Sequence, residues 1–411
     1  MTLLKGATLA DGSIADARLS RGLVAEVGTE LPASGDDVVD LSGYVLLPAP
    51  AEPHAHLDKA LTAGRVSSQP GDLDAAIAAW HEHRRTLGVE DIVERAERAA
   101  LASLARGVTA IRTHVDVGEG IELRAAEALI EVRERLRALI DIQVVALSYP
   151  LTGPGEGAEN RDLVRAALEI GVDVVGGAPH IDPDPVGQIE FCLELAREFG
   201  QPVDLHMDEH MRADALDLAD LARLVASRRL DPVTASHCVS LGLQPAGRQR
   251  VISDDVARAG ISVVSCPATN LHLQARDQPT ATPRGITALR ALLDADVTVA
   301  GGGDNVQDFF HPLGCGDPLQ TASLLVLAGQ LDVAQAYGLV SDGARAAMGL
   351  EPAGVAPGRP AELLAVAAGS LQEAIATGTE DRIVFRRGRV VERTRTVREV
   401  EARTNEGDGR E

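Results

Sequence analysis

The stretch Pro202-Val-Asp-Leu-His-Met-Asp-Glu-His210 joins an apolar run to a cluster of imidazole and carboxylate side chains. Residues 202–205 predict a short buried strand, after which His206 and Asp208 stand two apart, so an extended chain sends both side chains to one face. Glu209 then points elsewhere unless the strand ends before it. Imidazole and carboxylate groups suit a divalent metal such as zinc or iron, and an additional Glu suits proton transfer. By itself the stretch is equally typical of a polar loop after a strand.

The alternation of a short apolar run with a helical stretch recurs on both sides of this segment, which is the pattern of strand–helix units around a parallel sheet. Eight strands are predicted, at residues 52–58, 107–116, 140–147, 172–179, 203–208, 233–237, 261–267 and 297–302. The stretches between them have apolar residues at helical spacing, and several end at glycines, as helices followed by a left-handed residue do. Eight such units predict an α/β protein built on a (β/α)8 TIM barrel, in which the catalytic groups follow the strands.

The two ends of the chain have a different pattern, in which short apolar runs are broken by turns. Residues 1–47 and 355–400 share this pattern, and we expect them to form one small β-sandwich domain. Residues 48–354 would then be a metal-dependent (β/α)8 barrel inserted between the two pieces. Residues 401–411 are polar and are expected to be a disordered tail.

The composition limits the partners and the compartment. Among 411 residues, 61 acids exceed 39 lysines and arginines, and the formal net charge of -22 argues against binding to nucleic acid or to an anionic membrane. The first residues lack the features of a signal peptide, no apolar run approaches the ~20 residues of a membrane-spanning helix, and the four cysteines form no closely spaced pair. We therefore expect a reduced cytoplasmic protein, with a homo-oligomer left open.

Further candidate metal ligands follow other predicted strands. His54 and His56 stand two apart on the first strand, so both side chains face the mouth of the barrel and can chelate one ion. His206 from the fifth strand and Asp304 from the eighth complete a set of three imidazoles and one carboxylate. Such a set suits one Zn²⁺ or Fe²⁺ ion and leaves a position for water. Because a bound metal lowers the pKa of water from 15.7 towards ~7, hydrolysis is the expected use.

Three residues are candidates for the catalytic proton transfers. Asp304 would take the proton of the water, His237 would hold the attacking hydroxide and the resulting oxyanion, and Glu209 would carry a proton to a substrate nitrogen. Each has a structural alternative. His237 is equally typical of a buried core histidine, and Asp304, in a Gly-Gly-Gly-Asp-Asn run, is typical of a turn or a helix cap. The structural alternative, however, requires a coincidence at every one of these positions.

Several longer motifs carry a resemblance to a known family. They are His54-Ala-His56-Leu-Asp58, Arg112-Thr-His114-Val-Asp116, His206-Met-Asp208-Glu209, Ser236-His237, Asn270-Leu-His272-Leu-Gln274, and Asp304-Asn-Val-Gln-Asp308 followed by Pro312-Leu-Gly314. In this order and spacing, from about residue 45 to 345, the chain resembles the amidohydrolase superfamily, specifically its cytosine deaminase-like branch. The resemblance implies a mononuclear iron or zinc site held by the four candidate ligands. It also implies that Glu209 transfers protons and that His237 orients the water.

The chain departs from cytosine deaminases at positions expected to contact the substrate. The glutamine with which cytosine deaminases read the pyrimidine amide edge is replaced by Leu147-Ser-Tyr149-Pro150. Lys59 stands where cytosine deaminases tend to have Thr, and it resembles relatives that hydrolyse N-alkylamino groups from triazine rings. Asn305 replaces a second acid, and Phe309-Phe310 stand where an aromatic pocket wall is expected. We predict that the substrate is contacted by Lys59, Tyr149, Asn305 and Phe310.

The leading hypothesis is a metal-dependent hydrolytic deaminase, in which water attacks a ring carbon of a small nitrogen heterocycle and ammonia or an amine leaves. Among enzymes, the alternatives are an N-alkylamino-triazine aminohydrolase of the isopropylammelide type and a cyclic amide hydrolase. A catalytically silent metal-binding protein on the same barrel is disfavoured, because a decayed site is expected to lose proton-transfer groups such as Glu209 and His237 first.

Overall fold

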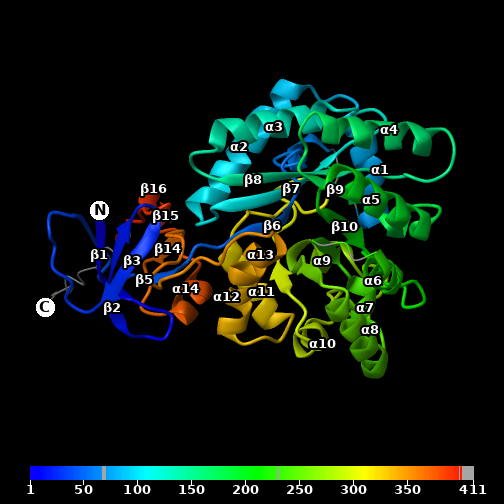
Figure 1. The fold of residues 1–411 in the computed structure, drawn as a ribbon. Helices are drawn as coiled ribbons and strands as arrows, with labels where there is room; N and C mark the ends of the chain where they lie inside the picture. The colour runs from blue at the N-terminus through cyan, green and yellow to red at the C-terminus, as the bar shows by residue number, and fades with distance from the viewer. Residues whose placement is uncertain (67–70, 229, 231, 398, 400–411) are drawn as a thin grey trace, which may run out of the picture.

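A barrel of eight parallel strands is the central element of the protein (Figure 1). The computed structural model describes residues 1–66, 71–228, 230, 232–397 and 399. Its barrel strands are β6 (Glu52–Ala55), β7 (Ala110–Asp116), β8 (Asp141–Leu147), β9 (Val174–Gly177), β10 (Val203–Met207), β11 (Val233–His237), β12 (Ile261–Ser265) and β13 (Val299–Gly301), paired in chain order. A parallel bridge between Ala55 and Asp304 brings the first strand to the end of the last. The predicted (β/α)8 fold is confirmed.

Amphipathic helices cover the outside of the barrel (Figure 1). In α2 (Val89–Ala105), Ile92, Ala96 and Ala99 are buried at helical spacing, whereas Glu94 is exposed. The other helices that follow barrel strands are α1 (Leu73–Arg84), α3 (Arg124–Leu136), α4 (Glu156–Glu169), α5 (Pro185–Phe199), α6 (Asp217–Arg228), α8 (Ala246–Arg258) and α10 (Leu289–Asp294). Shorter or later helices are α7 (Val239–Gly242), α9 (Pro267–Leu273), α11 (Pro318–Leu327), α12 (Val333–Val340), α13 (Asp342–Ala347), and the 3-10 turns η1 (Ala63–Arg65) and η2 (Pro179–Ile181).

The two ends of the chain meet in a second sheet beside the barrel (Figure 1). Its strands are β1 (Thr2–Thr8), β2 (Ile14–Ser20), β3 (Leu23–Gly28), β4 (Asp37–Asp40), β5 (Val45–Pro48), β14 (Leu363–Val366), β15 (Arg382–Arg386) and β16 (Arg389–Thr394). Strand β5 pairs antiparallel with β14 and also contacts β1, and this junction joins the two ends. Leu4, Leu19 and Phe385 belong to an apolar core of its own. The predicted β-sandwich built from both chain ends is confirmed.

Polar contacts hold the sandwich against the end of the barrel that lies away from the strand carboxyl ends. Arg386 donates to the carboxylate of Asp141, at the start of β8, at 2.7 Å, and to the carbonyl of Thr109, just before β7, at 3.0 Å. Arg382 donates to both carboxylate oxygens of Asp317, at 2.9 and 2.7 Å. In the described residues, Arg386 of the sandwich thus contacts the barrel at the amino ends of β7 and β8.

Several predicted segments differ from the structure, and most of the predicted barrel strands are shorter than expected, such as the first, which ends at Ala55. The C-terminal piece, expected to contain short strands and turns, also contains a helix, α14 (Leu371–Thr377), which Ser370 caps at its start and the left-handed Gly378 ends. The strand predicted at residues 261–267 ends at Ser265, because Pro267 begins α9, and the fixed φ of proline suits a first helical turn.

The exact domain boundaries, the cytoplasmic location and the oligomeric state stay predictions, and the predicted tail at residues 401–411 lies outside the described residues. Within the part of the chain that the structure describes, none of the helices combines the length and the apolar character needed to cross a membrane.

Candidate active site

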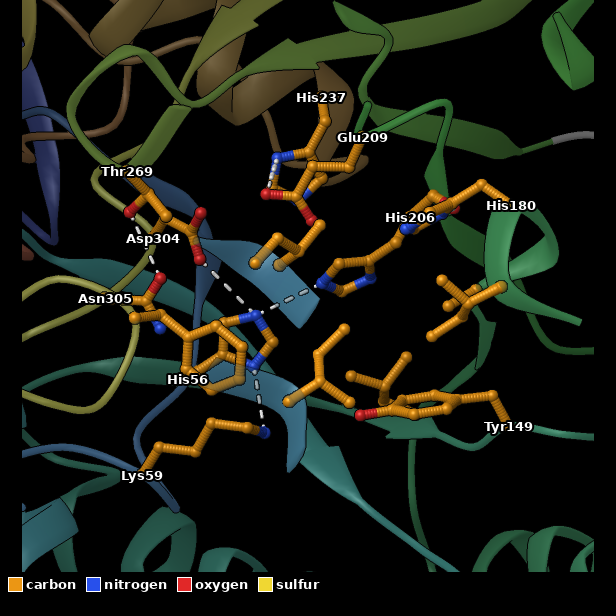
Figure 2. Close-up of a pocket in the computed structure, with 16 residues that line it drawn as sticks. His56, Lys59, Tyr149, His180, His206, Glu209, His237, Thr269, Asp304 and Asn305 are labelled. Atoms are coloured by element: carbon orange, nitrogen blue, oxygen red, sulfur yellow. Dashed lines mark hydrogen bonds and ion pairs between the residues drawn. The ribbon is translucent and has the colours of Figure 1, made fainter. Parts of the chain in front are cut away.

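A cavity opens at the carboxyl ends of the barrel strands (Figure 2). Its polar lining includes residues at or just after the ends of β6, β10, β11 and β13, namely His56, His206, Glu209, His237 and Asp304. Its apolar lining includes Leu73 and Ile77 of α1, with Leu147, Ala178 and Ile181. A cavity with one polar and one apolar wall suits a small ring that carries polar groups on its edge.

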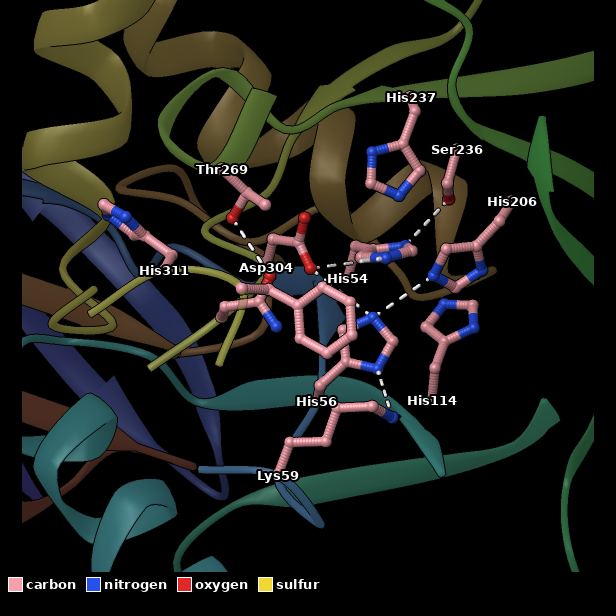
Figure 3. A network of polar contacts seen from close by, with 12 residues as sticks. His54, His56, Lys59, His114, His206, Ser236, His237, Thr269, Asp304 and His311 are labelled. Atoms are coloured by element: carbon pink, nitrogen blue, oxygen red, sulfur yellow. Dashed lines mark hydrogen bonds and ion pairs between the residues drawn. The ribbon is translucent and has the colours of Figure 1, made fainter. Parts of the chain in front are cut away.

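Three of the predicted metal ligands, His56, His206 and Asp304, line this cavity, and the fourth, His54, is buried against them (Figure 3). His56 Nε2 lies 3.1 Å from His206 Nε2, and Asp304 Oδ1 lies 3.4 Å from His56 Nε2 and 3.8 Å from His54 Nε2. In a tetrahedral site with bonds of about 2.0–2.1 Å, neighbouring ligand atoms lie about 3.3 Å apart. His54 Nε2 and Asp304 Oδ2 are also buried without a hydrogen-bond partner. The donor set therefore fits a divalent ion.

Two other groups of metal-ligating side chains in the described residues share His54. One adds Cys266 and His237 to His54 and Asp304, and the other joins His54 to His114 and Asp204. Burial raises the pKa of the Cys266 thiol well above its ordinary value, and a neutral thiol is a poor ligand. Asp204 is already paired with Arg112 at 2.9 Å, and that positive charge opposes a cation there. The three histidines with Asp304 remain the best donor set.

The charges at the cavity floor suit a cation. Burial lowers the pKa values of His54, His56 and His206 well below the ordinary histidine value, and neighbouring histidines and Lys59 add to the shift. Neutral imidazoles with free lone pairs result, which is the form that binds metals. Burial also raises the pKa of Asp304 well above its usual range, and the nearby carboxylate of Glu209 adds to this. A bound cation would offset this cost and favour the ionised carboxylate.

The turn after β10 aims Glu209, rather than Asp208, into the cavity. Strand β10 ends at Met207, and Asp208 adopts a left-handed backbone with φ of 49°. The Asp208 carboxylate accepts hydrogen bonds from the amides of Asp217 at 2.8 Å and Leu218 at 3.1 Å, at the start of α6. The prediction that His206 and Asp208 share a face is therefore wrong, because the strand ends before the alternation reaches Asp208. Glu209 was expected to point away unless the strand ended before it, and the strand does end, at Met207, so that Glu209 lines the cavity.

Glu209 and His237 lie on one wall of the cavity (Figure 2), and Asn270 of α9 contacts both of them. The Asn270 Nδ2 donates to Glu209 Oε1 at 3.0 Å and lies 3.3 Å from His237 Nδ1. Burial raises the pKa of Glu209 to about 8, and the hydrogen bond from Asn270 opposes that shift only in part. Burial lowers the pKa of His237 to about 3, so its ring is neutral. A carboxyl group that holds its proton near neutral pH thus lies beside a neutral imidazole.

The four residues predicted to contact the substrate all line the cavity, namely Lys59, Tyr149, Asn305 and Phe310. Lys59 Nζ donates to Asp116 at 2.6 Å and to Asp58 at 3.3 Å. The Tyr149 hydroxyl lies 3.3 Å from His81 Nε2. Phe309, expected to share the aromatic wall with Phe310, instead packs on Trp80 and His83 of α1, with ring centroids 5.6 and 5.1 Å away. Only Phe310 forms the wall, because consecutive side chains diverge from one another.

Comparisons with known proteins identify the family. Residues 74–392 match the sequence model of the amidohydrolase family. The chain belongs to the amidohydrolase family. It is 32% identical to the pterin deaminase of Rhizobium rhizogenes over 92% of this chain and 88% of that protein. It is 26% identical to the N-isopropylammelide isopropyl amidohydrolase of Pseudomonas sp. over 92% of this chain and 94% of that one.

The solved structure of 5-methylcytosine deaminase from Klebsiella pneumoniae, liganded with 5-fluorocytosine, superposes with a TM-score of 0.89 at 30% identity, over 97% of this chain and 99% of that one. The predicted membership of the deaminase branch of the amidohydrolase superfamily is confirmed. This amidohydrolase is an enzyme that hydrolyses carbon–nitrogen bonds other than peptide bonds. Its family uses a divalent metal, for which the histidine and aspartate cluster provides ligands.

Two side chains around the site of this amidohydrolase, Asn270 and His180, had no predicted role. Asn270 appeared only within a motif, although its amide contacts both Glu209 and His237. His180 lines the cavity, and its Nδ1 lies 3.1 Å from the carbonyl oxygen of His206. The position of His180 in the turn after a strand was the available signal. No local pattern marks Asn270, because its contacts depend on how α9 lies against the end of β10.

Proposed function

We propose that this amidohydrolase is a hydrolytic deaminase that exchanges an amino or alkylamino group on a ring carbon of a small nitrogen heterocycle for the oxygen of water, releasing ammonia or the amine. The observation that carries the proposal is Glu209, whose carboxyl group keeps a proton near neutral pH, with a pKa of about 8, and which lines the same cavity as the ligand cluster. A leaving amine needs such a proton donor. The similarity to deaminases of pterin and 5-methylcytosine supports the same reaction class.

One zinc or iron ion per chain is proposed to be held by the side chains that fit it, namely His54, His56, His206 and Asp304. A divalent ion at this position would lower the pKa of a bound water molecule and would so provide a hydroxide nucleophile at neutral pH. The ion would leave the neighbouring wall, with Glu209 and His237, free to act on the substrate.

The proton steps are assigned from the hydrogen bonds of each group. Asp304 Oδ2 has no partner, so it can accept the proton of the attacking water. Because the Asn270 amide donates towards His237 Nδ1, the proton of that neutral ring belongs on Nε2, which is also without a partner. His237 Nε2–H can therefore donate a hydrogen bond to the oxygen that develops negative charge. Glu209 transfers its proton to the departing nitrogen.

Substrate contacts are proposed for the opposite wall. Lys59 lines the cavity while its ammonium group donates to Asp116 and Asp58, and an ammonium has three N–H donors, so a ring oxygen or nitrogen can accept the third. Asn305 and Tyr149 add polar edges, and Phe310 offers a face on which a ring can stack.

A second candidate reaction is removal of an alkylamine from an N-alkylamino-triazine. The specific observation that favours it is the apolar wall formed by Leu73, Ile77 and Ile181, which suits an alkyl substituent. The relative that acts on N-isopropylammelide covers almost the whole chain.

The purified enzyme should be assayed for ammonia and isopropylamine with pterin, cytosine, 5-methylcytosine and N-isopropylammelide, with dihydroorotate as a ring-opening substrate. Ammonia from an aminated ring supports deamination, and isopropylamine supports the second candidate. Ring opening of dihydroorotate alone, without release of ammonia or amine, would overturn both.

Metal analysis tests the ligand assignment. About one zinc or iron per chain is expected in the wild-type protein, and His206→Ala should lose most of it, because a catalytic site has few ligands to spare. His272→Ala is the matched control, since His272 lies on α9 and pairs with Arg276. Full metal retention in His206→Ala would contradict the assignment.

A further inference from the structure

A chain of buried hydrogen bonds runs from His54 through Ser236 to Asp204, and Figure 3 shows its first link, between His54 and Ser236. His54 Nδ1 lies 2.9 Å from Ser236 Oγ on β11, and Ser236 Oγ donates to Asp204 Oδ1 on β10 at 2.9 Å. All three side chains are fully buried. None of them opens onto the cavity, so the chain cannot contact substrate.

The positions of the protons follow from the carboxylate at the end of the chain. Arg112 donates to Asp204 Oδ2 at 2.9 Å, so each of the two carboxylate oxygens accepts a hydrogen bond. The hydroxyl proton of Ser236 therefore points to Asp204 Oδ1. Ser236 Oγ must then accept from His54, which places the ring proton of His54 on Nδ1 and leaves the lone pair on Nε2. His54 Nε2 is the atom that faces Asp304.

Arg112 is itself held on three sides. Its Nε donates to Gln143 Oε1 at 2.9 Å, and its Nη1 donates to Thr234 Oγ1 at 3.1 Å as well as to Asp204. The layer therefore connects β7, β8, β10 and β11 across the barrel interior. A carboxylate held by such a layer is a fixed acceptor, and it can orient Ser236 before any ion binds.

The other two candidate histidine ligands are held differently, and the ring of His56 makes a hydrogen bond with the backbone of His114. His206 Nδ1 is buried without a hydrogen-bond partner. His56 Nδ1 faces the ammonium group of Lys59 at 3.4 Å, and an ammonium cannot accept a proton from it. Among the three candidate histidine ligands in the described residues, His54 is the one whose ring nitrogen contacts a side-chain hydroxyl.

We propose that Ser236 and Asp204 are positioning residues that hold His54 in the Nδ1–H tautomer and thereby set how tightly the metal is bound. This inference rests on the proposed metal site. Groups that orient a metal-bound histidine typically contribute 10–100-fold to metal affinity. Ser236→Ala removes the acceptor for Nδ1–H, lets the ring rotate and change tautomer, and should weaken metal binding by about that factor.

The test measures the metal dissociation constant and the rate of metal loss to a chromophoric chelator, using full-length protein loaded with Zn²⁺. Ser236→Ala should show weaker affinity and faster loss. Ser236→Thr keeps the hydroxyl and should restore values close to wild type. Ser265→Ala is the matched control, because Ser265 ends the next strand, β12, and is equally buried, but its hydroxyl has no partner. It should bind Zn²⁺ as the wild type does.

The outcomes separate this inference from the proposed function. A wild-type protein that binds no Zn²⁺ would overturn the metal site and the inference together. A wild-type protein that binds Zn²⁺ while Ser236→Ala has the same affinity and rate of loss would overturn only the inference. Should Ser236→Ala not fold, Ser236→Cys replaces it, since a thiol of similar size is a weak hydrogen-bonding group, and wild-type affinity in that variant would likewise overturn the inference.

Discussion

Glu209 and Asp116 are two buried carboxyl groups near opposite walls of the same cavity, and they differ in their partners. The Asn270 amide donates to Glu209 at 3.0 Å, and burial raises the pKa of this group to about 8. Asp116 accepts from Lys59 at 2.6 Å, Trp80 at 2.7 Å and Arg84 at 2.9 Å, and the two cations hold its pKa well below its usual range against the effect of burial. Burial alone therefore does not decide the protonation state; the charges of the partners do.

The two pKa shifts have opposite consequences for stability. The folded-state pKa of Glu209 lies above the ordinary value of 4.5, so folding takes up a proton and stability falls as the pH rises from about 4.5 to about 8. The folded-state pKa of Asp116 is lowered, so its contribution is present above its unfolded pKa and is lost only as the pH falls through the folded value. At neutral pH, Asp116 stabilises the wall that holds Lys59, whereas Glu209 lowers the stability of the metal-free protein.

The largest expected effect comes from Glu209→Gln. This change removes the proton donor without removing a proposed ligand, so kcat should fall by about 10² to 10⁴-fold while metal content and fold are retained. Steady-state kinetics, metal analysis and circular dichroism check this. Turnover at the wild-type rate would remove Glu209 from the mechanism, and with it the main reason to prefer deamination over a generic hydrolysis.

Asp116→Asn should act on folding instead. Removal of the charge leaves Lys59 and Arg84 without their shared buried partner, and breaking such a pair typically costs about 3–5 kcal/mol. Urea unfolding at pH 7 should show this loss, while metal-free Glu209→Gln, measured beside it, should be at least as stable as the wild type. Equal destabilisation by the two substitutions would contradict the comparison.

The smallest expected effect is on the pH dependence of kcat/KM. If the protonated carboxyl of Glu209 donates to the leaving nitrogen, kcat/KM should fall as the pH rises through its pKa, which is about 8 without metal and lower beside a bound cation. The residual activity of Glu209→Gln should lack this limb, because an amide does not titrate. A limb that persists unchanged in the variant would assign the titration to another group.

Much of the fold and the candidate ligand set could be predicted from local patterns. Strand alternation and helical spacing are properties of neighbouring residues, so eight strand–helix units were recognisable without any long-range contact. A parallel barrel brings all strand carboxyl ends to one rim, and this topology is why His54, His56, His206 and Asp304, distant in sequence, were expected together. The structure does bring these four side chains within reach of one ion.

Other features were decided only by the tertiary structure. The left-handed Asp208 turns Glu209 into the cavity, against the alternation expected for a strand that continued through it. Ser236 meets His54 from a position 182 residues away, and the protonation of Glu209 and Asp116 depends on which cations lie within hydrogen-bond distance of each. Residue types and periodicity determine at which strand end a side chain lies. A hydrogen bond or a pKa, however, depends on interatomic distances, and a change of about 1 Å alters it. Distances on that scale between remote segments exist only once the barrel has closed.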